Sequence, residues 1–228
     1  RIFTPRYGDI NERRHQLHEV IRLSGMNLVI NDIDMPLIVK VASIQKERMQ
    51  VYFIDNDEYF KLEESFDKDG ELYADNDERC IFFAKGIVET VKKLNWSPDL
   101  IHIQGWLGAL LPLYLQTYCK EEPIFQHTKV ITCFLREPFT GSLDEGILEK
   151  IAFDEITPDQ APELKEPNSM NLIKLASRYS DGITTLRGTL PEEAISYITS
   201  LGKPFLCEEN IETTCKSYPQ FYKEVMGK

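Results

Sequence analysis

Short apolar segments alternate along the chain with longer stretches of helical periodicity. Apolar segments rich in β-branched residues are typical of strands that a parallel sheet buries on both faces. Five of them recur, at Ile2–Thr4, Val51–Ile54, Leu100–Ile103, Val130–Phe134 and Ile183–Thr185. We therefore expect an α/β fold with one Rossmann-like, mostly parallel sheet and helices on both of its faces. The segment Leu100–Ile103 should lie inside this sheet, parallel to its neighbours.

A different pattern fills residues 19–48, where turn residues separate short β-branched runs. These runs are Val20–Leu23, Asn27–Ile30 and Leu37–Val41, and Gly25 and Asn31-Asp32 stand between them. Closely spaced strands with polar turns are typical of hairpins. The sequence therefore predicts an antiparallel β insertion at about residues 19–48.

The spacing of apolar residues, together with residues typical of helix ends, predicts several helices and loops. Asp75 or Asn76 should cap a helix that runs to about Leu94 and buries a stripe of Ile81, Ala84, Val88 and Val91. Further helices are predicted at Trp106–Tyr118, Asn171–Arg178, Pro191–Leu201 and Tyr218–Met226, with an edge strand at Phe205–Cys207. The acidic stretch from Asp55 to Asp77 should be a loop, with a turn at Asp67–Gly70.

The segment from Ser97 to Leu115 carries the most informative polar residues. Pro98 ends the preceding helix, and His102, Gln104 and Trp106 lie at or near the end of the expected strand Leu100–Ile103. Open α/β sheets bind ligands at the carboxyl ends of their strands. The loop Arg136–Gly141 and the segment after Thr185 should reach the same edge, so we expect a ligand crevice there.

Composition and charge narrow the classes of function. The 228 residues have a formal net charge of −11, which disfavours binding to nucleic acid or to an anionic membrane surface. An apolar stretch long enough to span a bilayer is lacking, and the five scattered cysteines suggest reduced thiols in a cytoplasmic protein. Neither a metal-ligand cluster nor a glycine-rich phosphate loop appears in the sequence, so we expect no metal and no cofactor.

Four segments together resemble a known family. Pro98 to Trp106 is similar to the pattern P-D-x-x-H-x-H-D-W, and Tyr73 to Phe83 is similar to Y-x-D-N-x-x-R-F-x-x-F. With Pro5-Arg6-Tyr7 and Tyr179-Ser180-Asp181, they resemble the N-terminal catalytic domain of bacterial glycogen synthases and plant starch synthases. The short single-domain bacterial homologues are the most similar. This resemblance implies one half of a GT-B glycosyltransferase, spanning residues 1–228 without the C-terminal donor domain.

The resemblance also implies an activity, and the chain departs from the family at the residues concerned. The family transfers glucose from a nucleotide-glucose to an α-1,4-glucan. Here Gln104 replaces the second histidine of the motif, Gly105 replaces its aspartate, and Arg187 stands where a small hydroxyl residue is usual. Glutamine offers only neutral donors and acceptors, so we assign no catalytic residue. The expected binding residues are His102, Gln104, Gly105, Trp106, Arg79, Arg136, Thr185 and Arg187.

Three hypotheses remain open at this point. The first is a glycosyltransferase domain that is inactive alone and needs a donor domain from a partner chain or from further sequence. The second is a non-catalytic relative that binds glucan, a small carbohydrate or a protein partner, and the third is an unrelated nucleotide-binding α/β protein. Trp106 has two interpretations as well: a ring on which a sugar stacks, or a core residue that anchors the next helix.

Overall fold

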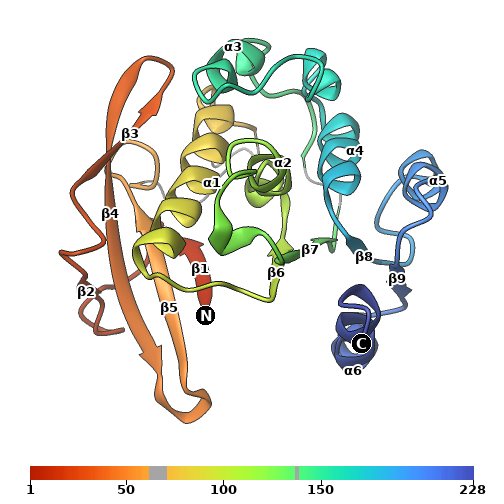
Figure 1. Cartoon of the computed structure of the whole chain (residues 1–228), viewed down its shortest axis with the longest axis horizontal. Coiled ribbons are helices and arrows are strands. Elements are labelled where there is room, and N and C mark those ends of the chain that lie inside the picture. The colour runs from red at the N-terminus through yellow and green to blue at the C-terminus, as the bar shows by residue number, and fades with distance from the viewer. Residues whose placement is uncertain (62–70, 137–138) are drawn as a thin grey trace.

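Two β-sheets form the centre of the molecule in a computed structural model that describes residues 1–61, 71–136 and 139–228 (Figure 1). The first sheet has the order β1-β5-β4-β2, with β3 paired to β4, and the second has the order β6-β7-β8-β9. The strands of the first sheet are β1 (Ile2–Pro5), β2 (His18–Glu19), β3 (Met26–Ile30), β4 (Ile33–Ile44) and β5 (Met49–Asp55). Those of the second sheet are β6 (Leu100–Gln104), β7 (Lys129–Phe134), β8 (Gly182–Leu186) and β9 (Phe205–Glu208).

The antiparallel insertion is present in the first sheet. Strand β4 pairs antiparallel with β2, β3 and β5, whereas β1 pairs parallel with β5. The two-residue turn between β3 and β4 is Asn31-Asp32, and both residues have positive φ, as a tight hairpin requires. The expected strand Val20–Leu23 is instead a turn in which the Leu23 N–H donates to the carbonyl of Val20.

The second sheet is parallel throughout, which confirms the Rossmann-like class. The expectation of a single sheet is wrong, however, because β1 and β5 do not pair with any strand of the second sheet among the described residues. The expectation that Leu100–Ile103 is internal is also wrong, since β6 is an edge strand of its sheet. The apolar pattern of a strand reports the burial of its faces and carries no information about which of its edges is hydrogen-bonded.

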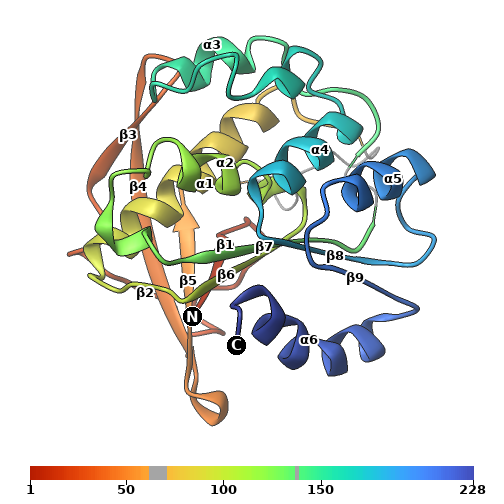
Figure 2. The ribbon, with the colours of Figure 1, turned by 45° about the vertical axis from the view of Figure 1, so that its right-hand side comes forward.

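Helices cover both faces of the second sheet (Figure 2). On one face, α1, α2, α4 and α5 belong to the large core cluster, while α6 packs on the opposite face through Phe221 and Val225 against Ile131. The helices are α1 (Asn76–Lys93), α2 (Leu111–Gln116), α3 (Ile147–Ala152), α4 (Ser169–Tyr179), α5 (Glu192–Ser200) and α6 (Ile211–Val225), with 3₁₀ turns at Gln45–Glu47, Trp106–Gly108, Pro123–Phe125 and Pro162–Lys165.

Two helices differ from their predicted bounds. The helix expected at Trp106–Tyr118 is divided into a 3₁₀ turn and α2, which has Pro112 in its first turn. Helix α6 begins at Ile211 instead of Tyr218, because Asn210 and Thr213 form a reciprocal capping box and Pro219 lies within the helix. An internal proline argues against a helix in the sequence, which is why the first two turns were not predicted.

The helix α1 is the central packing element. Its predicted stripe Ile81, Ala84, Val88 and Val91 is buried, and the helix contacts strands of the first sheet and the turn after β6. Asp75 does not cap it through its side chain, because that carboxylate binds Arg79.

Within the described residues no helix has the length and apolar character needed to cross a membrane. The predicted turn Asp67–Gly70 and residues 137–138 of the expected crevice loop lie outside the described part of the chain.

Candidate functional site

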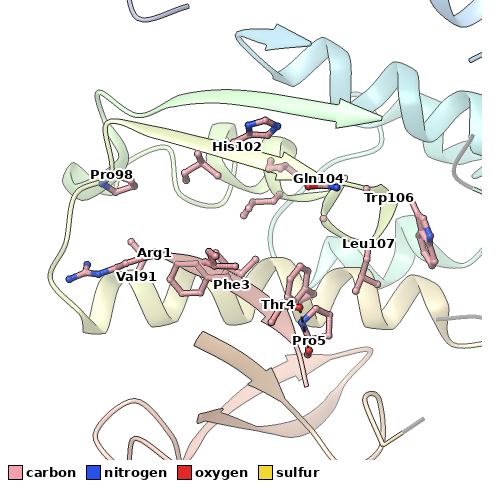
Figure 3. A pocket seen from close by; sticks show the side chains of 18 of the residues that line it. Arg1, Phe3, Thr4, Pro5, Val91, Pro98, His102, Gln104, Trp106 and Leu107 are labelled. Atoms are coloured by element: carbon pink, nitrogen blue, oxygen red, sulfur yellow. Dashed lines mark hydrogen bonds between the residues drawn. The ribbon is translucent and has the colours of Figure 1, made fainter. Parts of the chain in front are cut away.

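A groove of about 1220 Å³ separates β1 of the first sheet from β6 of the second (Figure 3). Its carboxyl end is lined by Pro5, Tyr7, Gln104, Gly105 and Arg136. This is the edge at which the sequence predicts a ligand crevice, because parallel strands expose their carboxyl-end loops together. We call this part of the groove the carboxyl-end crevice.

The turn after β6 directs Gln104 toward solvent. Gln104 is the last residue of the strand and is exposed, and Gly105 follows it with φ of 82°. The N–H of Gly105 donates to the carbonyl of Cys133 at 3.0 Å, so the turn stays attached to β7. A positive φ favours glycine at this position. Arg136, which follows β7, is exposed and lines the same crevice.

Trp106 lies in the core, although part of it lines the groove. The residue is 8% exposed, and its ring is 5.2 Å from the ring of Phe139 in an edge-to-face arrangement. Gly108 allows this turn to pack tightly, because a Cβ there would lie 2.8 Å from the side chain of Ile103. The geometry therefore supports the interpretation of Trp106 as an anchor of the turn and leaves little ring surface for a sugar.

His102 is engaged by the last helix. Its Nδ1 lies 2.7 Å from the hydroxyl of Tyr222, and its ring meets the edges of Tyr218 and Tyr222 at right angles. Burial lowers the pKa of His102, which favours the neutral imidazole. A neutral, aromatic-enclosed imidazole is poorly placed to exchange protons with a ligand in the carboxyl-end crevice.

The other three expected binding residues are not among those that line the groove. Thr185 is fully buried, and its hydroxyl donates to the carbonyl of Phe134 at 2.7 Å. Arg187 is exposed and pairs with Glu209 at 3.0 Å on the surface. Arg79 is 3% exposed and holds Asp75 through two hydrogen bonds. These contacts give each residue a structural partner within the chain.

Sequence reasoning missed the aromatic and charged residues that surround the crevice. Tyr7 follows β1, and Tyr218 reaches the groove from α6. Asp55, at the end of β5, is 1% exposed and binds Lys40 at 2.9 Å and Arg6 at 3.1 Å. The one signal in the sequence is the i, i+4 spacing of Tyr218 and Tyr222, which places both rings on one face of the predicted helix Tyr218–Met226.

The crevice is therefore suited to hydrogen bonding with neutral or singly charged groups. Gln104 offers an amide, Arg136 offers a guanidinium, and no aspartate or glutamate is among the described residues that line the groove. The buried charges nearby are already compensated, since Asp55 binds two cations. Such a set can bind sugar hydroxyls, and it lacks a paired acid and base of the kind that hydrolytic sites use.

Comparisons with known proteins agree with this fold. The sequence model of the starch synthase catalytic domain matches residues 1–202. The glycogen synthase of Chlorobium limicola is 31% identical over 200 residues, covering 86% of this chain and 40% of the relative. That of Chlorobium chlorochromatii is 39% identical over 162 residues, covering 68% of this chain and 32% of the relative. The chain thus spans less than half the length of these relatives.

A solved structure with a similar fold is the catalytic domain of starch synthase IV from Arabidopsis thaliana, bound to ADP and acarbose. The match has a TM-score of 0.70 and 17% identity, and it covers 92% of this chain and 44% of that one. At this identity the likeness concerns the fold, which is that of a GT-B glycosyltransferase. Together with the sequence matches, it shows that the chain belongs to the glycogen and starch synthase family.

Proposed function

We propose that this chain is the acceptor-side domain of a glycogen- or starch-synthase-type glycosyltransferase, which binds α-1,4-glucan at the carboxyl-end crevice and does not transfer glucose alone. The observation that carries this proposal is the exposed Gln104 at the end of β6, in a crevice with neutral hydrogen-bonding groups. The acarbose and ADP bound to the Arabidopsis neighbour make carbohydrate binding a reasonable function for this scaffold.

The proposed lack of independent transfer rests on the residues at the crevice. Stabilising a departing nucleoside diphosphate requires fixed positive charge or hydrogen-bond donors. Arg136 is the only arginine or lysine at the carboxyl end among the described groove residues, while Arg187 is paired with Glu209 outside the groove. His102 is enclosed by Tyr218 and Tyr222. In this proposal residues 1–228 form one domain, and the donor-binding half comes from another polypeptide segment or a partner chain.

The alternative function is a non-catalytic relative that binds glucan or a protein partner through the same crevice. Its support is the replacement of ionisable family residues by Gln104 and Gly105, which removes the proton chemistry of the motif. Both functions place the protein where nucleotide sugars and glucans occur, and we propose the cytoplasm. The free cysteines, three of which are buried, agree with a reducing compartment.

Radiolabelled transfer from ADP-glucose and UDP-glucose to a glucan primer tests the proposal, together with retardation of the protein in gels that contain glycogen. We expect retardation without turnover. A Gln104→His variant, which restores the second histidine of the family motif, should remain inactive because the donor-binding groups are still lacking. Turnover by the 228-residue chain that Gln104→Ala abolishes would contradict the claim of inactivity, and the absence of retardation would contradict glucan binding.

A further inference from the structure

A group of exposed cationic side chains lies around β2, at the outer edge of the first sheet. Between residues 13 and 22 these side chains are Arg13, Arg14, His15, His18 and Arg22. None of them has an ion-pair or hydrogen-bond partner in the described part of the chain. Three arginines and one glutamate, Glu19, give the segment a positive formal charge within a chain of net charge −11. We call residues 13–22 the basic patch.

The backbone attaches the basic patch firmly to the first sheet. The N–H of Leu17 donates to the carbonyl of Glu12 at 2.9 Å, and the N–H of Val20 donates to the carbonyl of Val39 at 2.8 Å. Leu23, which follows the patch, is 1% exposed and belongs to the main core. The backbone is therefore already in place for a partner, so binding would restrict mainly the arginine side chains.

The composition of the basic patch is that of a protein interface. Ile21 is 84% exposed and has Arg22 as its neighbour, and the segment between residues 13 and 22 contains no lysine. Arginine is enriched and lysine is depleted in protein–protein interfaces. Because arginines repel one another, two basic patches do not pair with each other. The complementary surface is therefore acidic, with an apolar group in reach of Ile21.

Such a surface is present on α3 and the loop that follows it. Phe153, directly after α3, is 52% exposed, and Glu149 lies four residues earlier on the same side of the helix. Glu155 and Asp159 follow in the loop. All three carboxylates are exposed and have no ion-pair partner within the residues that the structure describes. We call Phe153 and these three carboxylates the acidic patch.

We propose that the basic patch of one molecule binds the acidic patch of a second copy of this chain, so that molecules associate head to tail. Strand β2 and helix α3 lie apart in both ribbon views, so the two patches do not meet within one molecule (Figures 1 and 2). A contact between two different surfaces of the same chain is heterologous, and it produces either a closed ring or an open row of molecules.

The size and charge of the patches set the expected strength of this association. A stable interface usually contains about 20–30 residues on each side, and both patches are smaller. The association should therefore be weak and should depend on protein concentration. Exposed charges supply most of it, so added salt should weaken it by screening them.

The association is independent of the proposed glucan binding. Neither patch contains a residue that lines the groove, so the carboxyl-end crevice stays open in the assembly. An assembly would carry several crevices, and linked sites on one polymer bind it more tightly than a single site does. Association could therefore strengthen glucan binding, but it does not require it.

Sedimentation velocity on two neutralised variants tests the inference. The first removes the arginines and the isoleucine of the basic patch: Arg13→Gln, Arg14→Gln, Ile21→Ser and Arg22→Gln. The second removes the acidic patch: Glu149→Gln, Phe153→Ser, Glu155→Gln and Asp159→Asn. At about 100 µM protein and about 50 mM salt the parent should associate, and about 500 mM salt should reverse this. Each variant alone should be monomeric. An equimolar mixture should form heterodimers and nothing larger, because only one complementary contact remains.

A matched control separates the patch from a general effect of charge. Neutralising exposed lysines elsewhere, by Lys46→Gln, Lys120→Gln and Lys223→Gln, removes the same positive charge and should leave the association of the parent unchanged. Thermal unfolding checks that all variants fold, since every substituted side chain is exposed.

The remaining outcomes overturn the inference. A parent that stays monomeric under these conditions has no such contact. Association that persists in either variant alone uses another surface, and a monomeric mixture shows that the two patches do not bind each other. If the parent is monomeric and binds a polyuridine oligonucleotide that the first variant does not bind, nucleic acid occupies the basic patch instead. Retardation in glycogen gels is read separately, and its absence contradicts glucan binding without affecting the sedimentation result.

Discussion

The hydroxyl of Tyr222 lies 2.7 Å from Nδ1 of His102, 120 positions earlier in the chain. This contact attaches α6 to the edge strand β6. Tyr218, one turn before Tyr222, stacks on the Tyr222 ring at 5.4 Å and meets His102 edge-on at 4.9 Å. The histidine that the family resemblance placed among the ligand-binding residues therefore has a structural contact with the last helix.

Replacing Tyr222 by phenylalanine should destabilise the protein by about 1 kcal/mol, the usual net value of one hydrogen bond. The ring and its packing remain, so the loss reports the bond to His102. Equilibrium unfolding in urea measures the change. The matched control is Tyr218→Phe, whose hydroxyl makes a long contact of 3.6 Å with Cys133 Sγ and should cost less. An equal loss in the two variants would contradict the assigned bond.

Stability should fall as the pH drops below about 6.5, the usual pKa of histidine. Burial lowers the pKa of His102 in the folded state, so the unfolded chain takes up this proton first. The unfolded state then binds more protons than the folded state, and the free energy of unfolding rises with pH across this window. The stabilisation that results from the lowered pKa of His102 is fully present above about pH 6.5. Urea titrations between pH 5 and 7.5 measure the free energy of unfolding, which should depend less steeply on pH in His102→Gln than in the parent. An unchanged pH dependence would argue against a neutral His102.

Replacing Trp106 by alanine should cost about 3–5 kcal/mol, as expected for an emptied aromatic core site. The residue is 8% exposed and packs on Phe139. In a Trp96→Phe background Trp106 is the only tryptophan, and its fluorescence should not respond to maltooligosaccharide. A stable Trp106→Ala variant that loses glucan binding would show instead that a sugar stacks on the ring.

Lys85→Met should destabilise the protein by about 3–5 kcal/mol, because it leaves a buried carboxylate uncompensated. Lys85 pairs with Asp154, both side chains are 5% exposed, and the hydroxyl of Tyr114 also donates to Asp154 at 2.7 Å. The double variant Lys85→Met, Asp154→Leu should recover part of the loss in thermal unfolding. Lys216→Met is the exposed control: its pair with Glu212 lies on the surface and should contribute little.

Gln104→Ala should weaken retardation by glycogen while leaving the melting temperature nearly unchanged. Gln104 is exposed at the end of β6 and makes no side-chain hydrogen bond with the described residues, so its removal costs the fold little. Gln126→Ala, at an exposed position that does not line the groove, is the matched control and should bind as the parent does. Equal retardation of the parent and Gln104→Ala would remove Gln104 from the binding site.

The local pattern of the sequence was sufficient to identify most elements of the fold. The apolar runs became β1, β5, β6, β7 and β8, the hairpin turn at Asn31-Asp32 is present, and the buried stripe of α1 is the predicted one. These features depend on side-chain periodicity and turn chemistry within a few residues, which a single sequence records. The carboxyl-end position of Gln104 and Gly105 follows from the same local information.

Tertiary structure decided which of the expected site residues remain available to bind a ligand. His102 meets Tyr222, Arg79 binds Asp75, and Thr185 bonds to the carbonyl of Phe134. Apart from the pair of Arg79 and Asp75, these partners lie far apart in the sequence, and no local pattern predicts them. The same holds for the edges of β1 and β6. A strand's sequence shows how its faces are buried, whereas the hydrogen bonding of its edges depends on which other strand lies beside it.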